Sequence, residues 1–405
     1  MITILHNESC AVFAKTVKEL LYELFHNNVS IELVLSGQVT SWPGEPEWND
    51  LLIFLFDESS TPEQSDDFIR NFLSNRQETA LLLPVAINNF TLIPPGVASE
   101  YKALPFDNSI LIPDGGLTRR VGAMLGLRLQ GRNTKVFISY RAVDGTQIAK
   151  QIEAHLHELG YKPWRDEALE LDGDTRILPG DLVQKNIESA LTKASLLLLI
   201  DTPESINSRW ISEEINIADG MLIPILPVVF RTKSDQKKGP RLRTLLNLQR
   251  WVDMPFEDAH VQTPLSEDEL DTVTQQIETY LCDIFIRRCR VPFIVENSFK
   301  DAGYDWASLN KALSMYRSSK VNNRRFQTTV NSHCSAYSEV YLPALDKFRQ
   351  FLKTQPNSNY AFFIYDGDLL SFNQLECFLD GYVTVLHYQE VSALLASNFV
   401  DVGNK

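Results

Sequence analysis

The chain has 405 residues, of which 44% are hydrophobic and 10% aromatic, and its formal net charge is −14. This length accommodates two or three domains, each with its own core, and the composition excludes a disordered or fibrous chain. The acidic balance argues against a protein that coats nucleic acid, because phosphate binding needs clustered cations.

The first 130 residues alternate short apolar segments with amphipathic ones. This pattern predicts strands at Ile2–Leu5, Ser30–Leu35, Leu51–Phe56 and Ala80–Ile87, and helices at Ala11–His26, Gln64–Ser74 and Leu117–Leu129. The continuous apolar run at residues 51–56 is typical of a strand that is buried on both faces of a parallel sheet.

The same alternation restarts at Lys135. It predicts strands at Val136–Tyr140, Tyr161–Trp164, Ser195–Ile200, Ile223–Phe230 and Gln249–Val252, and helices at Thr146–Leu159, Leu182–Leu191, Ile211–Ala218 and Glu267–Arg288. Gly160 is a typical helix stop. Strands that alternate with helices indicate a doubly wound parallel α/β sheet.

The two halves resemble each other in sequence. LLIFLFDESSTPE followed by LLLPVAI in the first half matches LLLLIDTPES followed by ILPVVF in the second. Asp57 precedes Pro84 by 27 residues, and Asp201 precedes Pro227 by 26. A duplicated domain and two unrelated Rossmann-like units both fit this pattern.

After Arg288 the pattern changes. Residues 296–355 are polar and predicted to be helical, and a smaller α/β or α+β unit follows, with strands at Tyr360–Tyr365 and Tyr382–His387 and helices at Phe372–Leu379 and Gln389–Ala396.

Residues 1–130 carry 8 Lys or Arg and 16 Asp or Glu, residues 131–285 carry 17 and 25, and residues 286–405 carry 13 and 11. We therefore expect domains at 1–130, 131–288 and 289–405, of which only the last is slightly basic.

The cysteines indicate the compartment. They are Cys10, Cys282, Cys289, Cys334 and Cys377, an odd number without a Cys-x-x-Cys pair, which favours free thiols over disulfides or zinc. The start MITILHNESC lacks the features of a signal peptide, and the longest apolar runs have the length of a strand. We expect a cytoplasmic protein that binds no metal and enters no membrane.

The middle segment carries a series of motifs in a set order. Phe137-Ile-Ser139-Tyr140-Arg141-x-x-Asp144 covers the first strand and its loop, and Gly160-Tyr-Lys-Pro-Trp164-Arg-Asp166 covers the second. Leu178-Pro-Gly-Asp181 and Ser205-Ile-Asn-Ser208-Arg-Trp210-Ile-Ser-Glu213-Glu214 follow. In this order, residues 134–285 resemble a TIR (Toll/interleukin-1 receptor) domain of the prokaryotic immune-effector type. The resemblance implies a flavodoxin-like doubly wound parallel sheet.

The residues themselves suit a cationic planar ligand. Ligands of open α/β sheets bind beyond the carboxyl ends of the strands, where Asp144, Asp166 and Trp210 fall. Trp210 and Glu214 are four residues apart at a helix start, so they share one face. The indole can stack on the nicotinamide ring of NAD+. The carboxylate beside it can face the positive charge that builds up on the ribose when the glycosidic bond breaks. Trp210 and Glu214 could instead serve as a packing anchor and a favourable helix-terminal charge.

The resemblance implies which residues act. Glu214 would be the catalytic carboxylate of an NAD+ nucleosidase, and NAD+ would be the substrate, with no cofactor. The substrate-binding residues would be Trp210, Phe137, Ser139, Arg141, Asp144, Asp166 and Ser208. The protein would be an antiviral defence effector that is activated by self-association through TIR domains. The alternatives are a non-enzymatic TIR scaffold and a synthase of a cyclic ADP-ribose-type messenger.

The flanking segments are expected to bind a trigger or a partner protein. Counted from Asp57, the position of Trp210 falls on Asp66 and that of Glu214 on Arg70. If the first segment is a TIR-like copy, it has therefore lost the carboxylate and the indole, and we expect no NAD+ cleavage there.

Overall fold

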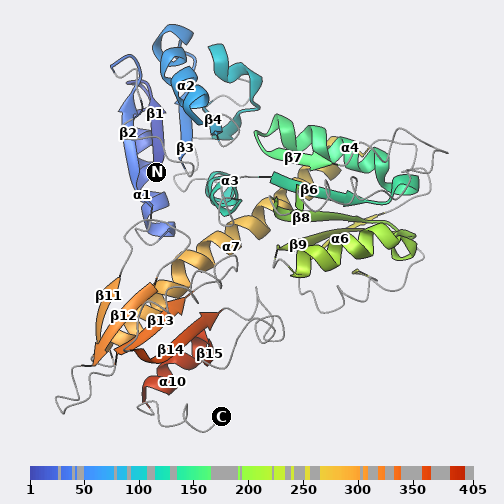
Figure 1. The fold of residues 1–405 in the computed structure, drawn as a ribbon. Coiled ribbons are helices and arrows are strands. Elements are labelled where there is room, and N and C mark those ends of the chain that lie inside the picture. Colours follow the sequence, from blue (N-terminus) through green and yellow to red (C-terminus); the bar gives the residue numbers. More distant parts are fainter. Residues whose placement is uncertain are drawn as a thin grey trace. The chain divides into compact units, whose positions relative to one another are not determined.

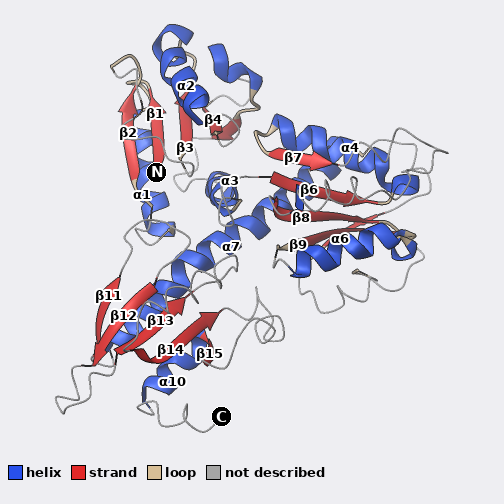
Figure 2. Ribbon diagram, in the orientation of Figure 1, coloured by secondary structure: helices blue, strands red, loops and turns tan. Residues whose placement is uncertain are grey.

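The chain divides into two compact units in the computed structural model. The first comprises Met1–Leu24 and Ser30–Asp283, and the second Phe25–Val29 and Ile284–Lys405. The structure describes residues 1–25, 29–38, 42, 50–76, 80–88, 93–106, 115–127, 135–165, 190–191, 194–220, 223–232, 239–240, 251–255, 265–301, 304–308, 318–323, 333–338, 358–365 and 384–396. Figure 1 and Figure 2 show these elements.

The first unit begins with a parallel five-stranded sheet in the order β2-β1-β3-β4-β5. Its strands are β1 (Ile2–His6), β2 (Ile31–Leu35), β3 (Leu51–Phe56), β4 (Leu81–Ile87) and β5 (Leu104–Phe106). Its helices are α1 (Ala11–Leu24), α2 (Pro62–Arg76), the short 3-10 helix η2 (Gly96–Glu100) and α3 (Gly115–Gly126). Every residue of β3 and β4 is buried, as expected for central strands covered on both faces.

The second sheet of this unit has the order β7-β6-β8-β9-β10 and is also parallel. Its strands are β6 (Lys135–Tyr140), β7 (Lys162–Arg165), β8 (Ala194–Asp201), β9 (Ile225–Arg231) and β10 (Val252–Pro255), and its helices include α4 (Ala142–Glu158), η4 (Ser205–Asn207) and α6 (Arg209–Gly220). The predicted flavodoxin-like parallel sheet is confirmed. The two sheets share one strand order, which both a duplicated domain and two separate doubly wound domains would show.

Helix α4 ends as predicted at Gly160. This glycine has φ +81°, in the left-handed region that favours glycine. Its N–H donates to the carbonyl of His157, and the N–H of Tyr161 donates to that of Leu156. These two bonds form the Schellman motif, which satisfies the last carbonyls of the helix and turns the chain into β7.

Helix α3 packs closely against the part of α7 (Glu267–Asp301) that belongs to the first unit, up to Asp283. A Cβ added at Gly122 would lie 2.4 Å from Cys282 Sγ, and one at Gly126 would lie 2.4 Å from the carbonyl oxygen of Leu281. The missing side chains thus allow the two helices to approach each other.

A buried carboxylate lies at the same junction. Glu278 of α7 is 1% exposed, forms ion pairs with Arg119 and Arg120 of α3, and accepts a hydrogen bond from the Tyr161 hydroxyl at 2.9 Å. Burial and the charge of Glu278 raise the pKa of Tyr161 well above its usual value. Glu278 therefore connects the helix after the first sheet, the second sheet and α7.

The second unit has a mixed sheet in the order β11-β12-β13-β14-β15. Its strands are β11 (Tyr304–Ser308), β12 (Ser318–Asn323), β13 (His333–Ser338), β14 (Ser358–Tyr365) and β15 (Thr384–His387), followed by η7 (Tyr388–Glu390) and α10 (Val391–Ala396). The first two pairings are antiparallel and the last two parallel. The prediction of helices across 296–355 is thus wrong for three segments, which are strands. The predicted helix at Phe372–Leu379 lies outside the described residues.

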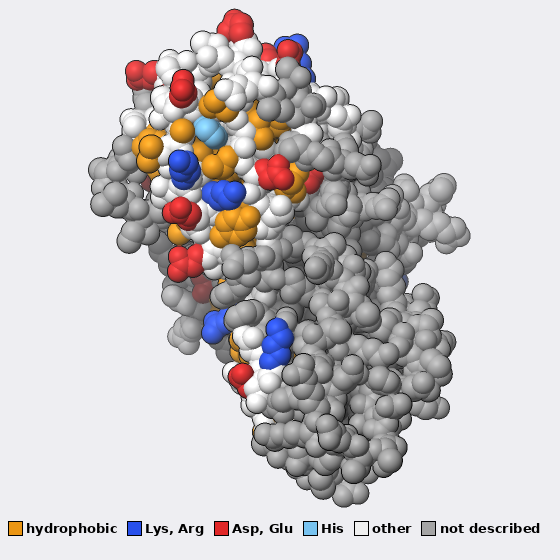
Figure 3. All heavy atoms as spheres, turned by 90° about the vertical axis from the view of Figure 1, so that its left-hand side faces the viewer, with side chains coloured by type: hydrophobic (Ala, Val, Ile, Leu, Met, Phe, Trp, Pro, Cys, Tyr) orange, Lys and Arg blue, Asp and Glu red, His pale blue; other side chains and the backbone are white. Residues whose placement is uncertain are grey.

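One face of the first unit is visible in Figure 3, which looks from the left-hand side of Figure 1. Its described Lys, Arg, Asp and Glu side chains lie interspersed among hydrophobic ones, so this part of the surface carries no patch of a single sign. Within the described residues, no helix combines the length and the apolar character that a membrane crossing requires.

Candidate functional site

The second sheet brings Ser139 and Glu214 together. Ser139 lies near the carboxyl end of β6 and Glu214 on α6, and their side chains are 1% and 6% exposed. The Ser139 hydroxyl donates a hydrogen bond of 2.5 Å to Glu214 Oε2. A buried carboxylate needs such a donor, and this one fixes the orientation of its carboxyl group.

The Trp210 indole lies at the surface, one turn before Glu214. It is 40% exposed, in contrast to the buried carboxylate. Ser208 begins the helix: its Oγ accepts from the N–H of Ile211 at 3.4 Å, and its carbonyl accepts from the N–H of Ser212. Ser208 thus acts as the N-cap of α6. By fixing where the helix starts, it determines the positions of the Trp210 and Glu214 side chains on the helix.

Phe137 lies in the core. It is 1% exposed, and its ring centroid is 4.8 Å from that of Trp164. It belongs to the cluster of buried residues that also holds Leu197, Leu199 and Ile211. Phe137 therefore supports β6 from within the sheet and presents almost no surface of its own.

Arg141 and Asp144 form an ion pair at the start of α4. Arg141 Nη1 lies 3.5 Å from Asp144 Oδ2, and the two side chains are 25% and 11% exposed. The other carboxylate oxygen, Asp144 Oδ1, is buried and has no hydrogen-bond partner among the described residues. Just beyond the carboxyl end of β6, a partly exposed guanidinium thus lies beside a carboxylate with one buried oxygen that lacks a donor among the described residues. Asp166 and the Pro179-Gly180 motif lie outside the described residues.

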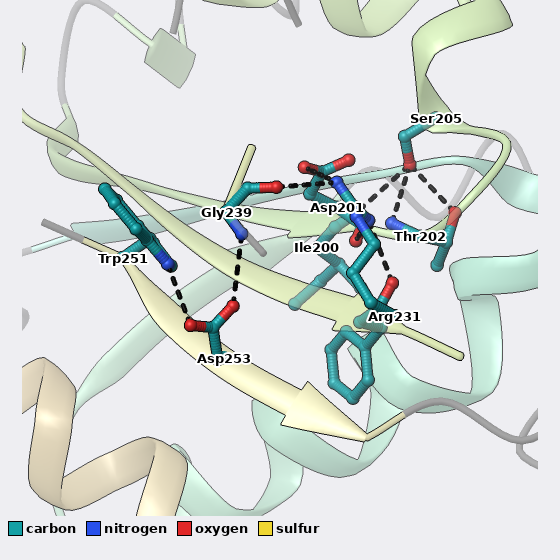
Figure 4. Close-up of polar contacts among 9 residues, drawn as sticks. Ile200, Asp201, Thr202, Ser205, Arg231, Gly239, Trp251 and Asp253 are labelled. Atoms are coloured by element: carbon teal, nitrogen blue, oxygen red, sulfur yellow. Dashed lines mark hydrogen bonds and ion pairs between the residues drawn. The ribbon is translucent and has the colours of Figure 1, made fainter. Parts of the chain in front are cut away.

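A second buried ion pair, between Asp201 and Arg231, was not foreseen from the sequence. These residues end β8 and β9, and Arg231 Nη2 lies 2.6 Å from Asp201 Oδ2 (Figure 4). The side chains are 1% and 6% exposed. The sequence does show a charged residue at the end of each of two apolar strands. That Asp201 and Arg231 form an ion pair follows only from the fact that β8 and β9 are neighbours in the sheet.

The first sheet ends in a different polar cluster. Asp57, which follows β3, accepts hydrogen bonds from Asn7, Ser9, Ser59 and Ser60. Burial alone would raise the pKa of Asp57, but these hydrogen bonds lower it from 3.8 to about 2. Beside it, burial and the charge of Asp57 raise the pKa of the Cys10 thiol to about 12, so this cysteine is not a reactive thiolate.

Helix α2 lacks a carboxylate at the position of Glu214. Its buried positions are Ser65, Phe68, Ile69 and Phe72, and those of α6 with the same spacing are Ile211, Glu214, Ile215 and Ala218. Phe68, rather than Arg70, is therefore the counterpart of Glu214. The Arg70 side chain is 66% exposed and pairs with Asp66 at 3.2 Å. The counterpart of Glu214 that was counted from Asp57, Arg70, is therefore two residues too far along the chain. The expectation that this position carries no carboxylate is unchanged, since Phe68 occupies it.

The comparison with protein families agrees with the geometry of the second sheet. Residues 136–264 match the family model described as the TIR domain. The comparison with curated proteins found no match. The match includes Ser139 on β6 and both Trp210 and Glu214 on α6. The segment 136–264 of this chain is therefore a TIR domain.

Proposed function

We propose that this TIR domain hydrolyses NAD+ at the bond between nicotinamide and ribose. The observation that carries the proposal is the pairing of a buried, hydrogen-bonded Glu214 with an exposed Trp210 one turn earlier. Both lie beyond the carboxyl ends of parallel strands, where open α/β sheets bind ligands.

The chemistry uses these residues as follows. The Trp210 indole stacks on the nicotinamide ring and holds it at the rim of the site. When the bond from ribose C1′ to the pyridinium nitrogen breaks, its electron pair leaves with nicotinamide, which departs neutral. Glu214 stabilises the positive charge that develops on the ribose. Water then adds to C1′ and releases a proton, which gives ADP-ribose.

Arg141 and Asp144 supply the polar contacts of this proposal. The partly exposed Arg141 guanidinium suits a phosphate oxygen. The unpaired Asp144 Oδ1 suits a ribose hydroxyl, which is a donor of the kind that this oxygen lacks. Binding would thus satisfy an acceptor that costs free energy while it is unpaired.

We also propose that the enzyme is a defence effector that acts in the cytoplasm and is activated by self-association. The segments that flank the TIR domain would bind the trigger and control assembly. In support, the first sheet has the strand order of the second, while the buried position on α2 that corresponds to Glu214 is occupied by Phe68.

The test compares NAD+ consumption by the purified wild type with that of Glu214→Gln and Glu213→Gln at high protein concentration. Glu213 is the matched control, because it is the next residue and pairs with Arg209 at the surface at 2.8 Å. We expect loss of activity in Glu214→Gln and near-normal activity in Glu213→Gln.

Product masses separate the related outcomes. ADP-ribose identifies a hydrolase, and a product lighter by one water identifies a cyclase. If the wild type consumes no NAD+ even when fused to an oligomerising tag, the enzymatic proposal fails and the TIR scaffold replaces it.

A further inference from the structure

The Asp201–Arg231 ion pair holds the strand ends from which the proposed site is built. Arg231 Nη1 donates to the carbonyl oxygens of Asp201 and Phe230, both at 2.8 Å, while Nη2 donates to the Asp201 carboxylate at 2.6 Å. Nη2 also lies 3.4 Å from the carbonyl oxygen of Gly239 (Figure 4). One planar guanidinium therefore ties the end of β8 to the end of β9 and to the chain that follows.

The chain beyond Asp201 leads directly to the site. The N–H of Thr202 donates to Ser205 Oγ at 2.9 Å, and this hydroxyl also lies 3.3 Å from the carbonyl oxygen of Ile200 (Figure 4). Helix η4 then leads to Ser208, the N-cap of α6. A short segment with hydrogen bonds at Thr202, Ser205 and Ser208 thus connects the ion pair to the start of the helix that carries Trp210 and Glu214.

The far side of the ion pair is also fixed. Gly239 has φ +84°, and its N–H donates to Asp253 Oδ1 at 3.3 Å. Asp253 in turn accepts from the Trp251 indole N–H at 3.0 Å (Figure 4). A Cβ at Gly239 would lie 3.1 Å from the Trp251 ring. Arg231 is therefore held between β8 and β10.

Stability alone does not account for this pair. Burying two charges costs desolvation that their attraction often fails to recover, and apolar replacements are often equally stable. Arg231 Nε is also buried without a hydrogen-bond partner among the described residues. The first sheet provides an internal comparison, because Asp57 follows its β3 while Asn88, not an arginine, follows its β4. A doubly wound sheet of this order thus forms without the ion pair.

We infer that Asp201 and Arg231 are positioning residues of the proposed NAD+ site: their ion pair sets the end of β8 and thereby the placement of Trp210 and Glu214. Neither residue is assigned to contact the substrate. The inference rests on the proposed function for its kinetic consequence, but the placement of Trp210 can be measured without any activity.

The test uses the full chain labelled with 5-fluorotryptophan, with the Trp210 resonance assigned from Trp210→Phe. In Arg231→Lys, which keeps the charge but loses the planar fork, we expect the Trp210 fluorine resonance to shift or broaden and kcat to fall about tenfold or more. The matched control is Arg120→Lys, which alters the buried ion pair with Glu278 in the same unit. It should lower the melting temperature without moving the Trp210 resonance.

A double variant, Asp201→Leu with Arg231→Met, separates position from stability. We expect it to fold with a melting temperature near that of the wild type and still to show a displaced Trp210 resonance and a reduced kcat. A wild-type Trp210 resonance in either folded Arg231 variant, or an equal shift in Arg120→Lys, would overturn the inference. A wild type without NADase activity would overturn the proposed function, while the fluorine spectra would still decide the positioning role.

Discussion

Replacing Ser139 by alanine tests the hydrogen bond on which the site depends. The change removes the donor 2.5 Å from Glu214 Oε2 and leaves a carboxylate that is 6% exposed without it. A buried hydrogen bond to a charged group contributes about 1.5–3 kcal/mol, and each kcal/mol shifts the melting temperature of a domain of this size by about 2–4 °C. We therefore expect Ser139→Ala to lower the melting temperature by about 3–12 °C.

The catalytic effect has a separate cause. Without the Ser139 hydroxyl, the Glu214 carboxyl group loses the donor that orients Oε2, and a misplaced carboxylate costs about tenfold to hundredfold in kcat. Melting is followed by circular dichroism, and kcat by NAD+ loss at 25 °C, where the variant remains folded.

The control is Ser65→Ala. Ser65 is also 1% exposed, but among the described residues its hydroxyl donates to a neutral carbonyl oxygen, that of Thr61, at 3.4 Å. It should lower the melting temperature less than Ser139→Ala and leave kcat unchanged. A Ser139→Ala protein with the melting temperature and kcat of the wild type would refute the role assigned to this bond.

Three further changes test other parts of the molecule. Gly126→Ala should lower the melting temperature by about 5 °C or more, because its Cβ would meet the backbone oxygen of Leu281 at 2.4 Å; an unchanged melting curve would contradict the close packing of α3 on α7. The ionised form of Asp57 adds stability above about pH 4 that is lost as the pH falls toward its folded-state pKa of about 2. Asp57→Asn should therefore lower the melting temperature most at pH 7 and less at pH 3, and a loss that does not depend on pH would contradict the lowered pKa. Trp210→Ala should raise KM for NAD+ about tenfold while changing stability by less than about 0.5 kcal/mol, because the indole is 40% exposed; an unchanged KM would remove Trp210 from the binding site.

The sequence predicted the two parallel sheets well because their strands are apolar runs between turn residues. The run at β3 was predicted with the bounds that the structure shows, and β8 and β9 to within two residues. Strand β5 was missed, since three residues with Pro105 in the middle carry no periodic signal.

The second unit was predicted less well. Its strands β11 and β12 have the sequences YDWAS and SSKVNN, which contain too many polar residues to show an alternation of apolar and polar positions. Their strand character comes from pairing with each other and with β13, and such pairing is a tertiary interaction that local propensity does not reveal.

The sequence by itself determined the α/β class, the order of the TIR motifs and the presence of Trp210 and Glu214 on one helix face, because each of these depends on residues close together in the chain. Only the tertiary structure decided that Ser139 is the partner of Glu214 and that Asp201 pairs with Arg231. The physical reason lies in the crossover connections of a parallel sheet, which carry the chain back so that the carboxyl ends of separate strands meet at one edge.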